Sequence, residues 1–242
     1  MKKLPSISPT DLARIAPLDE AQQRNQLSKL KAGHPPFTYR HTRLKLPDIL
    51  NLQVGGLFAG PKVSWARIEE ALISDCASGD ETTYNLMAAK ALHKFAEGAD
   101  IAGRLERDGF GGMPLGQGHR VSLWEKAIVR YEGRPHVVFI DLRSTKYLSK
   151  DGRRFAFSAQ HEQIRERDGD LADAGLLILR VHKPIEGARK VTPHTDAGVE
   201  LYSYDELNQM TQRTYELWDE IYFKRVTEER RRAAGDDGPL FR

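Results

Sequence analysis

The chain has 242 residues, of which 40% are hydrophobic and 29% are charged, with a formal net charge of +3. This composition is ordinary for a folded protein with a substantial apolar core, and it excludes a mainly disordered chain. No stretch approaches the ~20 apolar residues of a membrane-spanning helix, and no apolar segment follows the first lysines, so we expect no membrane insertion or export. The single cysteine, Cys76, excludes an intrachain disulfide and a zinc site built from cysteines. These features predict a cytoplasmic protein.

The positive charge is concentrated in two segments. Residues 1–50 contain nine Lys or Arg against four Asp or Glu, and residues 120–154 contain the same numbers. Such a local excess suits a polyanion such as DNA, because basic side chains displace the counterions of phosphates. A solvated surface with clustered charges explains the excess equally well.

The first hundred residues predict helices joined by turns. Apolar residues at helical spacing, preceded by capping side chains, predict four of them: 11–16 after Ser8 or Thr10, 20 to about 33 after Asp19, 65–77 after Ser64, and 81–97. Glycines and prolines around 55–61 predict a turn-rich link. The glycine-rich stretch 109–118 is predicted to be a loop. Because it leads from a helix into a strand, it is not a phosphate-binding loop.

The remainder of the chain predicts a mixed sheet followed by a long helix. Strands are expected at 119–131 and 136–142, joined by a hairpin turn at 132–135, and at 153–157, 175–181, 188–192 and 198–204. A helix is expected at 158–168. From Asp205 onward, apolar residues at three-four spacing predict a long helix that packs on the domain or pairs with a second subunit as a homodimer.

These elements indicate an α+β protein with a mixed sheet flanked by helices. We divide it into a basic helical segment (1–78), a mixed α/β core (79–203), a C-terminal helix (204–232) and a flexible tail (233–242).

The stretch Val137–Lys146, VVFIDLRSTK, carries the main candidate site. Asp141 and Arg143 are two residues apart at the end of an apolar run, so on a strand they would share a face. A carboxylate there could bind a divalent cation, and the neighbouring guanidinium could hold a phosphate. Glu125 and Glu162 are candidates for a second carboxylate. The simpler alternative is that Asp141 and Arg143 form an ion pair or cap the turn that follows.

Residues 81–182 resemble the core of the PD-(D/E)xK nuclease superfamily in the order of their elements, with "IDLR" standing at the acid-x-lysine pair. The resemblance implies a restriction-endonuclease-like core. It also implies a metal-dependent nuclease acting on DNA, with Asp141, Glu125 and Glu162 binding Mg²⁺ and Asp141, Arg143 and Glu125 as catalytic residues. Arg143 replaces the family's lysine. Because arginine stays protonated, it could orient phosphate but could not take a proton from water.

Two other catalytic patterns are excluded. His161-Glu162 begins like a zinc-protease helix, but Arg165 stands where the second histidine is needed, and no Gly-x-Ser-x-Gly occurs.

The last residues suggest a protein partner. The terminal Pro239-Leu240-Phe241 resembles the short peptides by which replication and repair proteins grip the bacterial sliding clamp, although the usual glutamine is missing. The alternative to the nuclease is therefore a non-catalytic regulatory protein with a nuclease-like fold, which binds nucleic acid or a protein partner.

Overall fold

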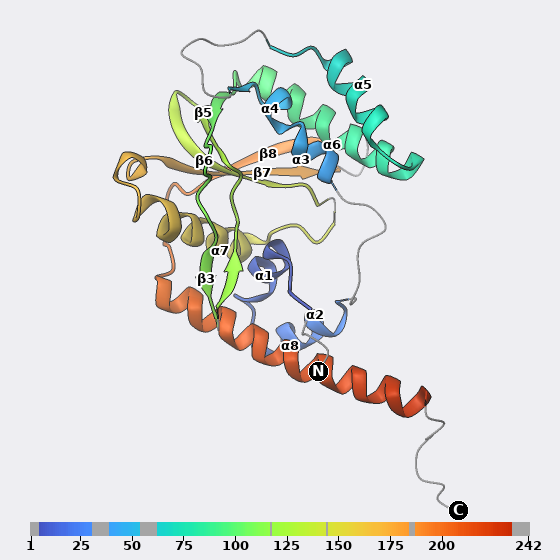
Figure 1. Cartoon of the computed structure of the whole chain (residues 1–242). Helices are drawn as coiled ribbons and strands as arrows, with labels where there is room; N and C mark the ends of the chain where they lie inside the picture. Colours follow the sequence, from blue (N-terminus) through green and yellow to red (C-terminus); the bar gives the residue numbers. More distant parts are fainter. Residues whose placement is uncertain are drawn as a thin grey trace, which may run out of the picture.

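A six-stranded mixed sheet separates two layers of helices (Figure 1). The computed structural model describes residues 5–30, 39–53, 62–116, 118–143, 145–183 and 187–233. In sheet order the strands are β1 (Leu52–Gln53), β2 (Ala102–Leu105), β5 (Ala127–Tyr131), β6 (Arg134–Asp141), β7 (Gly175–His182) and β8 (Lys190–Thr195). The expected α+β class with a mixed sheet between helices is confirmed.

Strand β6 lies at the centre of the sheet and contributes to both cores. It pairs antiparallel with β5 and parallel with β7. Because successive strand residues point to opposite faces, Val137 and Phe139 enter one apolar core, whereas Val138 and Ile140 enter the other. The continuous apolar run of this strand therefore reflects burial on both faces.

The β5–β6 hairpin is confirmed, with a tighter turn than predicted. Glu132 and Gly133 form the turn with φ values of 49° and 76°, and Arg134 and Pro135 already belong to β6. Positive φ at both central residues is the geometry that matches the twist of hairpin strands, and glycine adopts it without strain.

One helical layer is built from the front of the chain. It consists of α3 (Arg40–Leu44), α4 (Leu46–Ile49), α5 (Trp65–Asp75) and α6 (Gly79–Gly98), which lie together on one side of the sheet in Figure 1. Ser64 and Ser78 are the N-cap residues of α5 and α6. The two predicted helices in this part of the chain are confirmed. The predicted turns around 55–61 lie outside the described residues.

The second layer joins the two ends of the chain. It contains α1 (Pro9–Ile15), α2 (Glu20–Ser28), α7 (Lys150–Gln160) and α8 (Tyr204–Ala233), and α8 runs along its outer side (Figure 1). Leu207, Leu217 and Trp218 of α8 are buried in the core that α1 and α7 also line. The long helix is therefore confirmed and packs within its own chain. None of the described helices is both long and apolar enough to cross a membrane.

Three predicted elements of the middle of the chain are wrong. The segment 153–157 is helical, because Ser149 caps α7 and Phe155 and Phe157 bury on its inner face. The predicted loop 109–118 contains β3 (Met113–Leu115), which pairs with β4 (His119–Val121) in a separate two-stranded sheet. Residues 198–203 form no strand.

The helix predicted at 158–168 begins within α7 and then changes from α-helical to π-helical hydrogen bonding. Beyond Gln160 it continues as a π-helical turn, η1 (His161–Arg165), and a short 3₁₀ turn, η2 (Gly169–Leu171), precedes β7. The proposed division into segments and the homodimer remain predictions.

Candidate functional site

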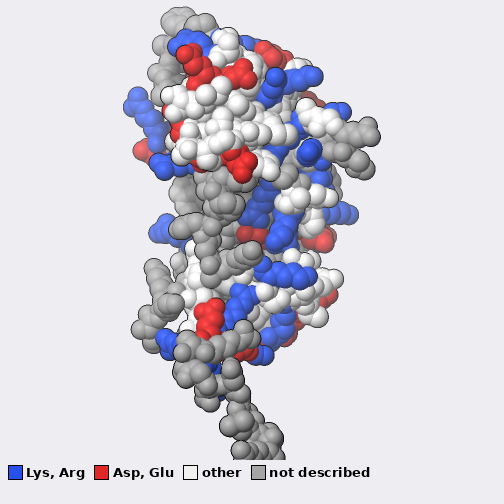
Figure 2. Space-filling model, turned by 90° about the vertical axis from the view of Figure 1, so that its right-hand side faces the viewer, with Lys and Arg blue, Asp and Glu red and all other residues white. Residues whose placement is uncertain are grey.

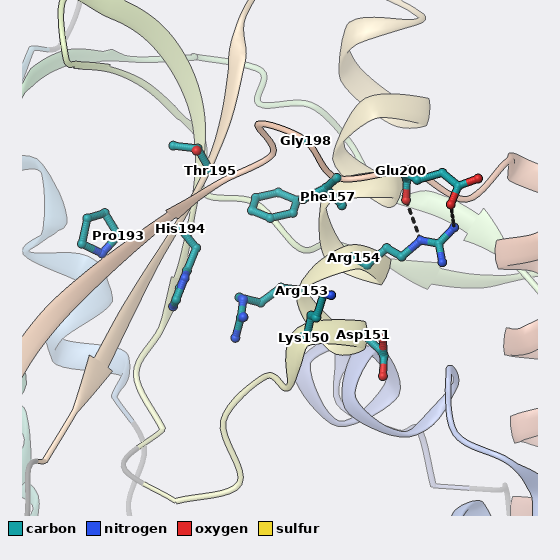
Figure 3. A pocket seen from close by; sticks show the side chains of 11 residues that line it. Lys150, Asp151, Arg153, Arg154, Phe157, Pro193, His194, Thr195, Gly198 and Glu200 are labelled. Carbon is teal, nitrogen blue, oxygen red and sulfur yellow. Dashed lines mark hydrogen bonds and ion pairs between the residues drawn. The ribbon is translucent and has the colours of Figure 1, made fainter.

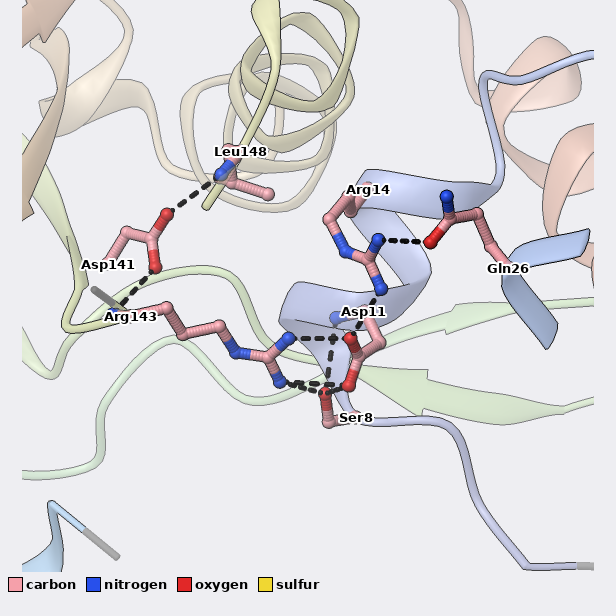
Figure 4. A network of polar contacts seen from close by, with 7 residues as sticks. All are labelled: Ser8, Asp11, Arg14, Gln26, Asp141, Arg143 and Leu148. Atoms are coloured by element: carbon pink, nitrogen blue, oxygen red, sulfur yellow. Dashed lines mark hydrogen bonds and ion pairs between the residues drawn. The ribbon is translucent and has the colours of Figure 1, made fainter. Parts of the chain in front are cut away.

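Asp141, the last residue of β6, caps the turn that leads to α7 (Figure 4). One carboxylate oxygen accepts a hydrogen bond from the amide of Leu148 at 2.9 Å, and the other accepts from the amide of Arg143 at 3.2 Å. The side chain is almost fully buried, with 1% of the residue exposed. The alternative that Asp141 caps the following turn is therefore confirmed.

Arg143 points away from Asp141 and binds helix α1 (Figure 4). Its guanidinium donates two hydrogen bonds to the Asp11 carboxylate, at 2.5 and 2.8 Å, and a third to the Ser8 hydroxyl at 2.9 Å. Asp11 also accepts from Arg14 at 3.1 Å. A two-pronged contact of this kind fixes both partners, so Arg143 connects the end of β6 to the start of the chain.

The two carboxylates respond to burial in opposite ways. Burial raises the pKa of Asp141, and the amide hydrogen bonds from Leu148 and Arg143 offset this only in part. Burial acts in the same direction on Asp11, but the hydrogen bonds and charge of Arg143 outweigh it and hold the pKa of Asp11 far below its usual value. Asp11, rather than Asp141, is thus the acid that Arg143 neutralises.

The structure does not gather the predicted magnesium ligands. Glu125 forms an ion pair with Arg43 of α3, and Glu162 lies on the π-helical turn after α7. Among the described residues, Asp141, Glu125 and Glu162 belong to no group of three His, Cys, Asp or Glu donors close enough to share one cation. Asp141 and Glu125 are each held by other partners, and both the magnesium site and a catalytic role for these residues remain predictions.

A basic cavity of about 620 Å³ lies between the start of α7 and the end of β8 (Figure 3). In Figure 3, Arg153 and His194 point toward one another across this space. Arg154 turns the other way and binds Glu200, donating to its backbone oxygen at 2.5 Å. Lys150 adds a further positive charge to the lining.

His194, at one end of this cavity, is close enough to Arg153 and Arg180 for their charges to act on it. Burial, together with the charges of Arg153 and Arg180, lowers the pKa of His194 to about 4. Burial and Arg180 also lower the pKa of Arg153. The Nε2 atom of His194 and the Nε atom of Arg180 are buried and have no hydrogen-bond partner among the described residues. Such an arrangement favours an anion, which would offset the repulsion between Arg153 and Arg180.

Sequence reasoning missed Arg153, Arg180 and His194 as one group, because they come from three separate segments. Arg180 gave the only local signal, since it is a charged residue in the otherwise apolar strand GLLILRV.

The charged surface is patchy rather than continuous. Figure 2 shows Lys and Arg side chains gathered across the middle of one face, with a few acidic side chains among them and more neutral surface above. This face is compatible with contact to a polyanion, and among the described residues acidic and neutral side chains interrupt the basic ones.

Comparison with known proteins gives a match over nearly the whole chain. A family model described as the sliding clamp-binding bacterial toxin SocB matches residues 10–231. A protein of Caulobacter vibrioides (strain NA1000 / CB15N), described as DNA replication inhibitor toxin SocB, is 38% identical over 226 residues, covering 93% of this chain and 94% of that protein. No solved structure gives a significant match.

Proposed function

The chain belongs to the SocB family of sliding clamp-binding bacterial toxins, and from that premise we propose that it binds the sliding clamp and inhibits DNA replication. The observation that carries this proposal is the family match over residues 10–231, which includes both helical layers and the sheet. A protein that binds the clamp acts in the bacterial cytoplasm. The proposal agrees with the regulatory alternative drawn from the sequence.

The core serves in this proposal as a scaffold. Helix α6, the β5–β6 hairpin, α7 and the parallel strand β7 follow one another in the order that the nuclease resemblance implied. At the position of the acid-x-lysine pair, however, Asp141 caps a turn and Arg143 is bound to Asp11. A restriction-endonuclease-like frame that carries no catalytic centre accounts for both observations.

A direct assay separates this scaffold from a nuclease. The purified protein is incubated with plasmid, linear and single-stranded DNA in the presence of Mg²⁺ or Mn²⁺, alongside Asp141→Ala. We expect no cleavage by either protein. Cleavage by the wild type that is lost in the variant would establish a catalytic site at Asp141 and contradict the scaffold role.

Two segments of the sequence are candidates for the clamp-binding peptide. The first is the tail Pro239-Leu240-Phe241, which lies outside the described residues. The second, QVGGLF, begins at Gln53 and ends in Leu57-Phe58, so it supplies the glutamine that the tail lacks. Gln53 is the last residue of β1, and residues 54–58 lie outside the described ranges. A glutamine with a Leu-Phe pair offers an amide for hydrogen bonding and two apolar anchors for a pocket, and it favours the second segment.

Binding to the immobilised clamp tests the proposal and distinguishes the segments. We expect the wild type to bind, Leu57→Ala/Phe58→Ala to lose at least about tenfold in affinity, and Leu240→Ala/Phe241→Ala to lose less. Ile73→Ala/Phe223→Ala is the matched control, because these apolar side chains are 54% and 47% exposed on the described surface. The absence of wild-type binding at micromolar concentrations would overturn the proposal. The reverse order of the two variants would assign binding to the tail.

Phosphate binding in the basic cavity is a second candidate function. The observation that favours it is that Arg153 and His194 point toward one another in the cavity and that the charge of Arg180 acts on both. DNA is the partner that the charge distribution of the sequence predicts. We expect DNA binding to weaken steeply with salt, and Arg153→Ala to lower the slope of log affinity against log salt by about 1. An unchanged slope in Arg153→Ala would show that the cavity does not take part in DNA binding.

A further inference from the structure

Three metal-binding donors meet where α3, α5 and α6 converge. His41 lies in α3, Cys76 directly follows α5, and Glu81 lies in the first turn of α6. The donor atoms of the imidazole, the thiol and the carboxylate all lie within 4.8 Å of one another. All three residues are partly exposed, so an ion and a water molecule can reach them from solvent.

The carboxylate of Glu81 is already oriented by the cap of its own helix. Its Oε2 atom accepts a hydrogen bond from the amide of Ala77 at 3.1 Å, while the Ser78 hydroxyl accepts from the Glu81 amide at 3.3 Å. This reciprocal cap leaves Oε1 on the side of His41, whose Nε2 atom is 3.6 Å away. A hydrogen bond on the second oxygen is the support that metal-binding carboxylates commonly have.

Helix α3 is fixed against α6 next to His41. The amide and the hydroxyl of Thr42 both donate to the Asn85 side-chain oxygen, at 3.0 and 2.8 Å, and both residues are fully buried. Asn85 in turn donates to the backbone oxygen of Glu81 at 2.9 Å. These contacts fix the backbones that carry His41 and Glu81 relative to one another. The site is therefore built before any ion arrives, which reduces the entropy lost on binding.

We infer that His41, Cys76 and Glu81 form a zinc-binding site with water as the fourth ligand. A thiolate, an imidazole and a carboxylate together suit Zn²⁺ better than the hard cations Mg²⁺ and Ca²⁺. Tetrahedral zinc with bonds of about 2.0–2.3 Å places its ligand atoms roughly 3.3–3.8 Å apart. Rotation of these partly exposed side chains would bring the donor atoms, now within 4.8 Å of one another, to these shorter separations. The ion would join three helices of one layer and stabilise that layer against the sheet.

The ion itself is the probe for the first test. The protein is stripped with a chelator, dialysed and titrated with Co²⁺, which reports on its ligands by absorption, and then with Zn²⁺. We expect one equivalent of Co²⁺ to give the visible bands of a tetrahedral site and a near-ultraviolet band from sulfur to cobalt. Zn²⁺ should displace the cobalt and raise the Tm. A wild-type spectrum without the sulfur band would overturn the site.

Variants test the individual donors. Cys76→Ser should abolish the sulfur band and weaken zinc binding by more than the roughly 10–100-fold that the loss of an outer-shell partner costs. Glu81→Gln keeps an oxygen that can accept from Ala77, so the cap survives while the charged ligand is lost, and zinc binding should again weaken. His93→Ala is the control. His93 also pairs with a glutamate of α6, Glu97, at 3.5 Å, but this pair is not part of the proposed zinc site, so zinc binding should not change. Wild-type zinc affinity in both ligand variants, with circular dichroism confirming that they are folded, would contradict the inference.

Discussion

Arg143, which follows the end of β6, and Arg153, in the first turn of α7, lie ten residues apart and have opposite surroundings. Arg143 is bound by Asp11 and Ser8, and Asp11 is shared with Arg14 (Figure 4). Arg153 faces His194 (Figure 3), and burial together with the charge of Arg180 lowers the pKa of Arg153.

The contrast separates structural from binding chemistry. The charge of Arg143 is neutralised by Asp11 of the same chain. Arg143 therefore connects the end of β6 to α1 and is not free to bind a ligand. At Arg153 the folded chain leaves positive groups close together, and an anion would relieve their repulsion. The motif with the strongest sequence signal is therefore the structural one, whereas the group with no sequence motif has the features of a binding site.

Removing Arg143 should have the largest effect on stability. Arg143→Ala leaves Asp11 with its side chain 15% exposed and without its main partner. We expect the free energy of unfolding, measured by chemical denaturation, to fall by about 2–4 kcal/mol, between the values for exposed and fully buried pairs. Arg104→Ala is the control, because the Arg104 side chain is 66% exposed in its pair with Glu106, and it should cost less than about 1 kcal/mol. Equal losses of unfolding free energy in the two variants would contradict a structural role for Arg143.

Removing the Asp141 carboxylate should have the next largest effect. Asp141→Ala leaves the buried amide of Leu148 without its acceptor, which should lower the free energy of unfolding by about 1–3 kcal/mol. Clamp binding should persist in the folded variant, since the carboxylate supports a turn. Loss of clamp binding without loss of stability would place Asp141 at the interface instead.

Arg153→Ala should separate stability from ligand binding. Because this substitution removes one of several neighbouring cations, we expect the free energy of unfolding to change by less than about 1 kcal/mol. Inorganic phosphate, measured by calorimetry, should bind the wild type and bind this variant at least about threefold more weakly. Arg130→Ala is the control, because Arg130 pairs with Asp100 on the exposed surface. Equal phosphate affinity in all three proteins would show that the cavity is not an anion site.

At neutral pH the smallest effect is expected from His194, whose contribution appears only as a dependence of stability on pH. The pKa of this imidazole is about 4 in the folded protein against an ordinary value of 6.5, so the unfolded chain takes up the proton at a higher pH. Its contribution to stability is therefore complete above pH 6.5 and is lost as the pH falls toward 4. We expect His194→Gln to flatten the pH profile of Tm in this range. A profile identical to that of the wild type would contradict the burial of neutral His194.

The sequence predicted the elements better than it predicted the contacts between them. Capping residues such as Ser8, Asp19 and Ser64 marked helix starts correctly, and the apolar run of β6 correctly indicated a buried strand. The segment RRFAF alternates like a strand, yet Ser149 and the buried phenylalanines make it a helix. Local alternation fails here because tertiary burial and a cap outweigh it.

The sites depended on partners that no local pattern could reveal. Asp11 and Arg143 are 132 residues apart, so the pairing that occupies Arg143 was outside the reach of spacing rules. His41 is likewise far in sequence from Cys76 and Glu81, and contacts such as that between Thr42 and Asn85, which fixes α3 on α6, bring it near them. Turn capping by Asp141 was the one contact at the candidate site that the sequence did suggest, as an alternative to catalysis.

The most direct test of the account is the affinity of the purified wild-type protein for the bacterial sliding clamp, measured on an immobilised clamp. We predict saturable binding that a peptide from another clamp-binding protein displaces and that Leu57→Ala/Phe58→Ala weakens at least about tenfold. No binding at micromolar concentrations, or binding that the competing peptide leaves unchanged, would contradict it.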